Sequence, residues 1–137
     1  AGDCAEYPEK ITSEISMPGN WAHAQVQGKY VAGMMAGKKE KPFSHISSYT
    51  SGGCGLIPCF VGDTRRSIAD RTIIRGTKED YPKFCELFIK DEKIIGAILI
   101  NRGHEMIPIR QMITNQADVS KIEDRLIDST VDIKTLL

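Results

Sequence analysis

The chain has 137 residues, and its 18 lysines and arginines balance 18 aspartates and glutamates, so the formal net charge is zero. This length suits one globular domain, or a small domain joined to part of a second, and 41% hydrophobic residues are enough to bury a core. A neutral chain has no general attraction for nucleic acid or an anionic membrane, and no apolar run approaches the roughly 20 residues that span a bilayer. We therefore expect a cytoplasmic protein with neither nucleic acid nor a membrane as a partner.

The first part of the chain predicts a loop followed by one helix. Residues 1–19 are rich in helix breakers, and we expect them to be mostly loop. Asn20 is a residue type that caps helix N-termini, and Gly37 is a typical helix stop. Between them, apolar and small residues recur at spacings of three and four, which predicts an amphipathic helix over residues 21–36. The stripe consists of Trp21, Ala24, Gly28, Val31 and Met35.

The basic stretch 38–41, which precedes Pro42, is the predicted boundary between two domains, residues 1–41 and residues 42–137. Beyond it the hydrophobic pattern changes from helical to mostly extended. Strands are predicted over residues 44–49, 56–61, 70–75, 81–89 and 93–100.

Two helices are predicted to follow the strands, over residues 105–115 and 120–127, with Pro108 in the first turn of the former. The apolar run 96–100 is the expected central strand. The fold class is therefore α+β, an antiparallel sheet of about five strands with two C-terminal helices, preceded by the single amphipathic helix.

Residues 42–137 contain no nucleophile elbow, no phosphate-binding loop and no HExxH, and we assign no catalytic residue there. Glu86 alternates with apolar neighbours, which is typical of the solvated face of a strand. The three histidines at positions 23, 45 and 104 are scattered and no CxxC occurs, so we predict no metal site.

The four cysteines at positions 4, 54, 59 and 85 leave two interpretations open. Two disulfides in an exported protein would use all four, although four cysteines in 137 residues are sparse for a disulfide scaffold. Cys54 and Cys59 have the CxxxxC spacing of the redox pair in some flavin-linked disulfide reductases. Pro58 and the glycines around them favour instead two thiols, one at a turn and one on a strand.

The most specific motif lies at the start of the chain. The sequence Ala1-Gly2-Asp3-Cys4-Ala5-Glu6 is followed, after a loop, by Asn20-Trp21-Ala22-His23-Ala24-Gln25-Val26-Gln27-Gly28. This combination resembles the last flavin-contacting segment of the FAD-dependent pyridine nucleotide-disulfide oxidoreductases, in which a strand ends in Gly-Asp and a loop leads to a helix with the pattern A-x-x-Q-G. The strongest resemblance is to the rubredoxin reductase, ferredoxin reductase, NADH oxidase and nitrite reductase flavoprotein types, whose C-terminal domains match the predicted sheet domain in length and order.

The resemblance implies cofactor-binding roles for Gly2, Asp3, Trp21 and Ala22. Gly2 would let the backbone approach the cofactor, and Asp3 would accept hydrogen bonds from the ribitol hydroxyls of FAD. The backbone N–H groups of Trp21 and Ala22 would face the negative charge of reduced flavin, with the indole against the isoalloxazine edge. From the residues alone, a turn or N-cap role for Asp3 and a core role for Trp21 also fit. Both glutamines of the helix motif are expected at the surface or between domains.

The two GxGxxG turns that hold FAD and NAD(P)H in that family are absent from the chain. The resemblance therefore implies a C-terminal fragment of an FAD-dependent NAD(P)H oxidoreductase that passes electrons through flavin to an acceptor. The fragment alone would neither hold FAD tightly nor transfer hydride, and residues 42–137 would cover the flavin and form an interface. Its expected partners are the FAD and NAD(P)H domains of the parent chain, an acceptor protein or small molecule, and a second copy in a homodimer.

Ala1 rather than a methionine opens the chain, so we expect either the C-terminal part of a longer polypeptide or a processed product. The second case gives the alternative hypothesis, a small α+β binding domain with two disulfides and no cofactor, which predicts no free thiol. A third hypothesis makes Cys54 and Cys59 a redox pair that serves a thiol substrate.

Overall fold

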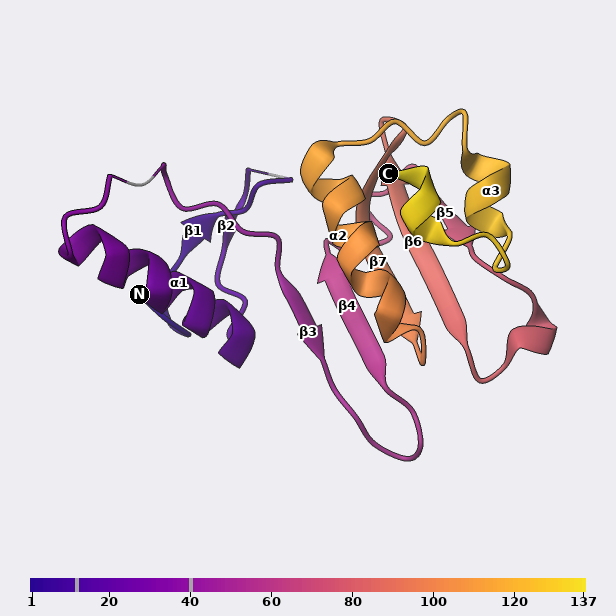
Figure 1. Cartoon of the computed structure of the whole chain (residues 1–137), viewed down its shortest axis with the longest axis horizontal. Coiled ribbons are helices and arrows are strands. Elements are labelled where there is room, and N and C mark those ends of the chain that lie inside the picture. Colours follow the sequence, from indigo (N-terminus) through magenta and orange to yellow (C-terminus); the bar gives the residue numbers. More distant parts are fainter. Residues whose placement is uncertain (12, 40) are drawn as a thin grey trace. The chain divides into compact units, whose positions relative to one another are not determined.

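The computed structural model describes residues 1–11, 13–39 and 41–137, which divide into two compact units, residues 1–49 and residues 50–137. The N-terminal unit contains a two-stranded sheet and one long helix, and the C-terminal unit contains most of a five-stranded sheet with its helices (Figure 1). The structure confirms the predicted fold class, which is α+β. As predicted, one helix precedes an antiparallel sheet of five strands, and two further helices follow the sheet in the chain.

The N-terminal unit begins with a short antiparallel pair, β1 (Tyr7–Pro8) and β2 (Ile15–Ser16). The backbone N–H of Glu9 donates to the carbonyl of Glu14 at 2.8 Å and closes the connection between them. Most of the described segment before the helix is loop, as predicted, but the sequence did not indicate this pair. Two residues per strand are too few to produce an alternating hydrophobic pattern.

The helix α1 (Trp21–Met35) has the boundaries that its capping residues predict, to within one residue. The Asn20 side chain accepts a hydrogen bond from the backbone N–H of His23 at 2.9 Å, as an N-cap does. After the helix, Gly37 has φ +80°, and its N–H donates to the carbonyl of Met34 at 3.0 Å. A positive φ is inexpensive only for glycine, so Gly37 ends the helix as predicted.

The face of α1 that the N-terminal unit buries is not its apolar stripe. The buried side chains are His23 and Gln27, whereas Trp21 is 76% exposed and Met35 is 85% exposed. The expectation that the motif glutamines lie at a surface is therefore wrong for Gln27. Aromatic side chains of β1 and of the segment after α1 pack on the His23 side of the helix. The predicted stripe lies beside this face and is only partly covered, since Ala24 and Val31 are half-buried whereas Trp21, Gly28 and Met35 are exposed.

The larger sheet has the spatial order β3-β4-β7-β6-β5, and the pairs β4–β7, β7–β6 and β6–β5 are antiparallel. The strands are β3 (Ser48–Thr50), β4 (Pro58–Gly62), β5 (Arg71–Ile74), β6 (Phe84–Lys90) and β7 (Lys93–Ile100). The predicted central position of the run 96–100 is confirmed, because β7 is the middle strand. Asp91 and Glu92, with φ +48° and +57°, form the two-residue turn that joins β6 to β7, between the strands predicted over residues 81–89 and 93–100.

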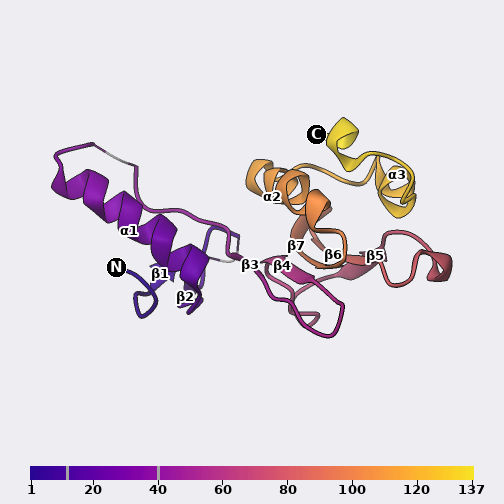
Figure 2. The same cartoon turned by 60° about the horizontal axis from the view of Figure 1, so that its bottom comes forward.

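Figure 2 shows α2 (Met106–Asn115) and α3 (Glu123–Ile127) on one side of the larger sheet. The core lies between this side of the sheet and the helices, where apolar side chains of the central strands meet those of α2 and α3. Its fully buried members include Cys85, Leu87, Ala97, Leu99, Ile109, Met112 and Leu126.

Several predicted boundaries differ from the structure. The strands predicted from residues 44 and 56 begin only at Ser48 and Pro58. Two other differences have identifiable local reasons. Strand β6 starts at Phe84 rather than at residue 81, because a 3₁₀ turn, η1 (Lys78–Asp80), and Pro82 precede it and proline cannot donate to a ladder. Helix α3 starts at Glu123 rather than at residue 120. The Asp118 side chain accepts a hydrogen bond from the N–H of Ser120 at 2.9 Å and forms a turn where the helix was expected.

The face of the sheet away from α2 and α3 is crossed by the segment that follows β4. The backbone of Asp63 passes over Gly96, and an added Cβ at Gly96 would lie 1.9 Å from the Asp63 carbonyl oxygen. Glu86 lies on the same face and is only 3% exposed, so the prediction that it belongs to a solvated face is wrong. Its carboxylate is 2.6 Å from the guanidinium of Arg66, which comes from the crossing segment, and this ion pair permits the burial.

A buried ion cluster ties the sheet to the C-terminal segment. Glu105 is 3.0 Å from Arg75 and 2.6 Å from Arg102, and all three side chains are at most 5% exposed. The Arg75 guanidinium also donates to the carbonyl oxygens of Leu126 at 3.0 Å and Asp128 at 2.6 Å, and to that of Val131. Arg75 thereby neutralises the negative end of α3 and holds the chain that leaves it.

Within the described residues, none of the helices is both long enough and apolar enough to span a membrane. The compact units divide after Tyr49. The assignment of residues 1–41 and 42–137 to different domains of a parent chain stays a prediction.

Candidate functional site

The N-terminus of α1 carries backbone donors that the helix itself does not use. The N–H groups of the cap residue and of the first three helical residues have no acceptor within a helix. In α1 the Asn20 side chain accepts from the N–H of His23, and the N–H of Ala24 makes the first regular helix bond, to the Asn20 carbonyl at 3.0 Å. Among the described residues, no acceptor is recorded for the N–H groups of Trp21 and Ala22, the two donors to which the resemblance assigns a cofactor role. These donors, together with the positive end of the helix dipole, suit a negatively charged or carbonyl oxygen.

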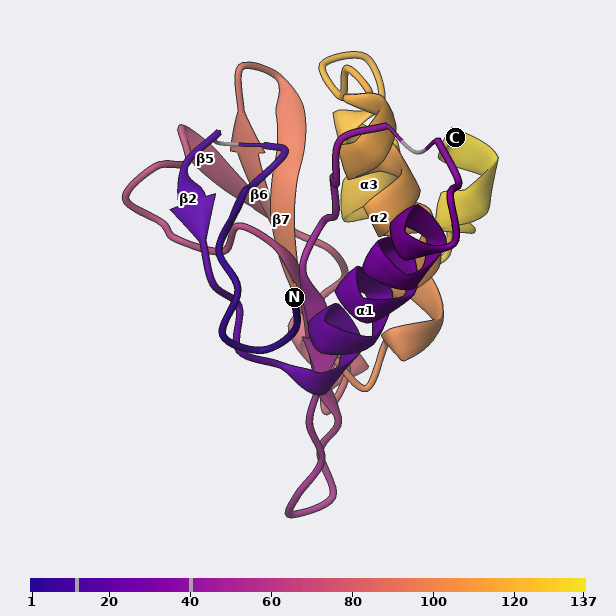
Figure 3. The ribbon, with the colours of Figure 1, turned by 90° about the vertical axis from the view of Figure 1, so that its left-hand side faces the viewer.

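The start of the chain runs beside the N-terminal half of α1 (Figure 3). The backbone N–H of Gly2 donates to the side-chain oxygen of Gln27, and Gly2 has φ +108°, a conformation that favours glycine. The exposed side chain of Asp3 follows, and Ala5 N–H donates back to the Gly2 carbonyl at 3.1 Å to form a tight turn. The structure therefore brings Gly2 and Asp3 to the helix that carries Trp21 and Ala22.

Trp21 is open to solvent within this chain, and Ala22 is half-buried. The indole therefore does not anchor the core of the N-terminal unit. Sequence reasoning missed Gln27 as the residue that fixes the Gly2 turn to α1. The spacing A-x-x-Q-G contained the signal, since it places this glutamine one turn beyond His23, on the same face of the helix.

A cluster of aromatic rings holds the chain start against α1. The ring of His23 stacks on Tyr7 with centroids 4.7 Å apart, and Phe43 meets both rings edge-on. His45 lies 5.6 Å from His23, and Tyr30 lies 5.2 Å from Phe43. Burial raises the pKa of Tyr7 to about 12, so its hydroxyl stays protonated and donates to the His45 carbonyl at 3.2 Å.

His23 is completely buried, and neither ring nitrogen has a hydrogen-bond partner among the described residues. Burial lowers the pKa of His23 below its ordinary value of 6.5, and the negative charge of Asp3 offsets part of this effect. In the unfolded chain the imidazole binds a proton more readily. The contribution of neutral His23 to the free energy of unfolding should therefore be at its full value above about pH 6.5. It should decrease as the pH falls from there toward the lowered pKa of the folded protein.

We expect urea unfolding midpoints to fall more steeply with acidification in the wild type than in His23→Phe, which keeps an aromatic ring but has no titratable group. The matched control is His104→Gln, at an exposed histidine, which should retain the wild-type slope. Equal slopes in the wild type and in His23→Phe would show that His23 does not carry this dependence.

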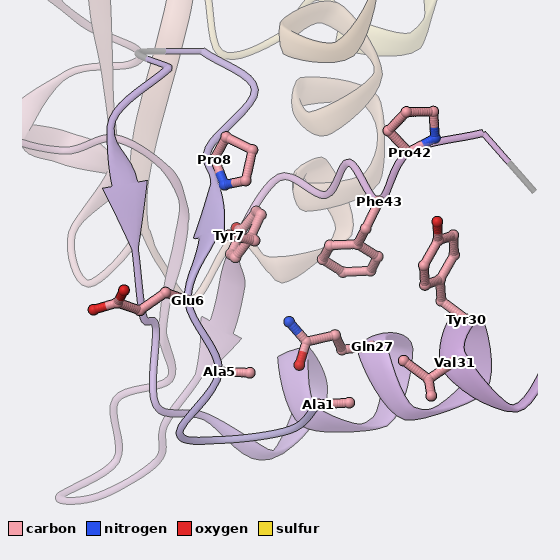
Figure 4. Close-up of a pocket in the computed structure, with 10 residues that line it drawn as sticks. All are labelled: Ala1, Ala5, Glu6, Tyr7, Pro8, Gln27, Tyr30, Val31, Pro42 and Phe43. Atoms are coloured by element: carbon pink, nitrogen blue, oxygen red, sulfur yellow. The ribbon is translucent and has the colours of Figure 1, made fainter. Parts of the chain in front are cut away.

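A cavity of about 390 Å³ opens next to the aromatic cluster, within the N-terminal unit. Figure 4 shows the rings of Tyr7, Tyr30 and Phe43 on one side of it and Ala1 and Ala5 near α1. Its lining is mainly apolar and includes none of the four candidate residues. Gly2, Asp3, Trp21 and Ala22 therefore gain no support as residues of this cavity.

The structure gives all four cysteines as free thiols. Cys54 is exposed in a turn with φ +52°, and Cys59 is buried in β4, which confirms the interpretation of one thiol at a turn and one on a strand. Burial raises the pKa of Cys85 to about 12, so this thiol is a poor nucleophile.

Thiol titration of the native chain with an aromatic disulfide reagent should therefore detect two fast-reacting thiols, Cys4 and Cys54. Unfolding without a reductant should release the other two, Cys59 and Cys85. The matched control is Cys54→Ser, which should lower the fast-reacting number by one. A native protein that shows no thiol even after unfolding would support the disulfide-bonded alternative.

The sequence family described as "Reductase C-terminal" matches residues 60–137, which is more than half of the chain. The chain belongs to this family. A sequence search among curated proteins gave no match.

Solved structures of several longer proteins are similar to this reductase C-terminal chain over about a third of their length. Putidaredoxin reductase, in its covalent complex with putidaredoxin, has a TM-score of 0.82 at 23% identity over 98% of this chain and 31% of that one. A ferredoxin reductase from Rhodopseudomonas palustris has a TM-score of 0.80 at 22% identity, over 98% of this chain and 32% of the other. An FAD-dependent pyridine nucleotide-disulphide oxidoreductase from Desulfovibrio vulgaris has a TM-score of 0.76 at 12% identity, over 98% of this chain and 36% of the other.

At these identities the structural likeness shows the fold, and the chain spans about a third of the length of each of these proteins. Together with the family match, it confirms the predicted resemblance to the C-terminal portion of FAD-dependent pyridine nucleotide-disulfide oxidoreductases.

Proposed function

We propose that the chain is the C-terminal part of an FAD-dependent NAD(P)H oxidoreductase, and that residues 1–41 form one edge of its flavin site. The observation that carries the proposal is the family match over residues 60–137. The geometry of the N-terminal unit supports the flavin assignment, because the turn that carries Asp3 is bonded to α1, whose Trp21 and Ala22 N–H groups have no recorded acceptor among the described residues.

The residues present fit one edge of a flavin site. The exposed carboxylate of Asp3 can accept hydrogen bonds from sugar-alcohol hydroxyls, and the N–H groups of Trp21 and Ala22 can donate to an oxygen that becomes negative on reduction. The exposed indole of Trp21 offers a flat apolar surface for an aromatic ring system. When bound, FAD would supply the redox chemistry, taking a hydride from NAD(P)H and releasing its two electrons to an acceptor.

Helix α1 leaves several large apolar side chains open in this chain. Trp21, Val26, Met34 and Met35 are each at least 40% exposed, although they point in different directions around the helix and only two of them belong to the predicted stripe. The remaining FAD domain of the parent chain, as the proposed neighbour, would cover some of these side chains. Residues 42–137 would then act as the cover and interface domain of the parent, in the cytoplasm.

The test is the absorption spectrum of the full-length parent protein, purified with bound cofactor. The proposal expects a yellow protein with flavin bands between about 370 and 450 nm that bleach when NADH or NADPH is added without oxygen. A folded, colourless parent that takes up no FAD would contradict it. The free cysteines of the structure weigh against the alternative of a disulfide-bonded binding domain.

The third hypothesis, a redox role for Cys54 and Cys59, gains no support from the geometry, since Cys59 is 2% exposed and Cys54 lies on a solvent-exposed turn. NAD(P)H-dependent turnover of the parent should therefore be unchanged in Cys54→Ser. Loss of turnover in that variant would restore the redox-pair hypothesis.

A further inference from the structure

Gln27 is a buried polar residue of α1 whose hydrogen-bond partner lies far away in the sequence. Its side-chain oxygen accepts a hydrogen bond from the backbone N–H of Gly2, which lies 25 residues earlier in the chain. Gln27 is only 6% exposed, and Figure 4 shows its amide beside Ala1 and Ala5, on either side of the bonded glycine in the chain. A buried amide costs free energy unless its polar atoms are paired, so the bond to Gly2 accounts for a glutamine at this position.

The same bond fixes the turn that carries Asp3. Gly2 is held on both sides, because its N–H donates to Gln27 and its carbonyl accepts from the N–H of Ala5 at 3.1 Å. The Asp3 side chain is exposed, and among the described residues no hydrogen bond is recorded for its carboxylate. The position of this carboxylate is therefore set by the backbone of the turn, and Gln27 joins the turn to α1.

Asp3 lies close enough to the first turn of α1 for its charge to act there. Burial lowers the pKa of His23, and the negative charge of Asp3 opposes this effect. His23 is the third residue of α1, and Gln27 lies one turn further along the helix on the same face. The turn that Gln27 holds therefore keeps the Asp3 carboxylate near the N-terminal end of the helix.

We propose that Gln27 is a positioning residue for FAD, which acts through Asp3 rather than on the cofactor itself. By its hydrogen bond to Gly2, it holds the Asp3 carboxylate where this group and the N-terminus of α1 bind one FAD together. The inference rests on the proposed function, which places flavin at this edge. Fixing the backbone of the turn in advance lowers the entropy that is lost when Asp3 binds the cofactor, and this raises the affinity for FAD.

A purely structural role for Gln27 makes a different prediction. In that case the loss of its hydrogen bond would weaken the N-terminal unit to the same extent whether or not Asp3 is present. If Gln27 acts through Asp3, removal of the carboxylate also removes the benefit of positioning it. A double-mutant cycle separates the two cases, because it measures whether the effects of two substitutions on FAD affinity add.

The cycle uses the full-length parent in its apo-form, with FAD affinity measured by the quenching of flavin fluorescence. Gln27→Met approximates the length of glutamine but has no oxygen to accept from Gly2. We expect it to weaken FAD binding about fivefold, as the loss of one hydrogen bond does, and by less than about twofold when Asp3→Ala is also present. The matched control is Gln25→Met, at the exposed glutamine of the same helix, which should bind FAD like the wild type.

An equal loss of affinity in both backgrounds would make the role of Gln27 independent of Asp3 and would overturn the proposal. Wild-type affinity in Gln27→Met would also overturn it. Urea unfolding of each apo-protein shows whether the variant is folded. If Gln27→Met does not fold, Gln27→Asn replaces it, since asparagine keeps a buried amide but is too short by a methylene group, and the same results are expected. A wild-type parent that binds no FAD, or an Asp3→Ala parent with undiminished affinity, would instead refute the proposed flavin edge on which the inference rests.

Discussion

Replacing Arg75 by methionine should cost about 3–5 kcal/mol of folding stability, as breaking a buried ion pair from one side usually does. The side chain is almost completely buried, and it bridges Glu105 and the carbonyl oxygens at the end of α3. Methionine approximates its length but donates nothing. Several buried acceptors would therefore lose their partners at once. Urea unfolding of the chain, followed by far-UV circular dichroism, measures the loss.

The matched control for this prediction is Arg71→Met on the same strand. Arg71 also contacts two carboxylates, those of Glu92 at 2.6 Å and Glu123 at 2.8 Å, but all three side chains are at least one-third exposed. Solvent screens exposed pairs, so the change should shift the unfolding midpoint only slightly. Similar losses for Arg71→Met and Arg75→Met would contradict the role given to burial. Hydrogen exchange should also show residues 125–131 opening first in Arg75→Met.

Replacing Gly96 by alanine should destabilise the sheet by about 3 kcal/mol, the upper part of the range for overpacked cores. The added Cβ would lie 1.9 Å from the Asp63 carbonyl oxygen and 2.4 Å from its carbonyl carbon. Both atoms belong to the backbone of Asp63, and the N–H of this residue donates to the carbonyl of Ile95 at 2.9 Å. Because no flexible side chain can move aside, the crossing segment must shift and would loosen the Arg66–Glu86 ion pair.

Gly103→Ala is the matched control, since its added Cβ would meet only Cys59 Sγ, at an ordinary 3.6 Å. It should leave the thermal unfolding midpoint nearly unchanged, while Gly96→Ala lowers it by several degrees, as a loss of this size implies for a small protein. A Gly96→Ala variant as stable as the wild type would mean that the segment does not cross the sheet this closely.

The sequence was sufficient to predict the elements with strong local signals. The apolar run of residues 96–100 indicated the central strand, and Asn20 and Gly37 indicated both ends of α1. It could not predict features that depend on contacts distant in sequence. The burial of Glu86 depends on Arg66, twenty residues away, and the turn at Asp118 shortens α3 through a side-chain hydrogen bond.

In the candidate site too, local motifs could be predicted from the sequence and contacts between distant residues could not. The Gly-Asp turn and the A-x-x-Q-G helix could be read from the sequence, but not the bond between Gly2 and Gln27 that joins them. The buried position of His23 was also unpredictable, because it depends on rings from β1 and from Phe43, which pack beside the apolar stripe of α1 rather than on it. Amphipathicity identifies the faces of a helix but not which part of the protein covers each of them.

The account depends most on the claim that the first residues of the chain form an edge of a flavin site. A direct test is to titrate FAD into the apo-form of the full-length parent and to follow binding by the quenching of flavin fluorescence. The variant Asp3→Ala is compared with Asp124→Ala, which removes an exposed carboxylate on α3. We predict that Asp3→Ala weakens FAD binding by about tenfold or more, as loss of a charged hydrogen-bond acceptor does, while Asp124→Ala binds FAD like the wild type. Wild-type affinity in Asp3→Ala would contradict the claim.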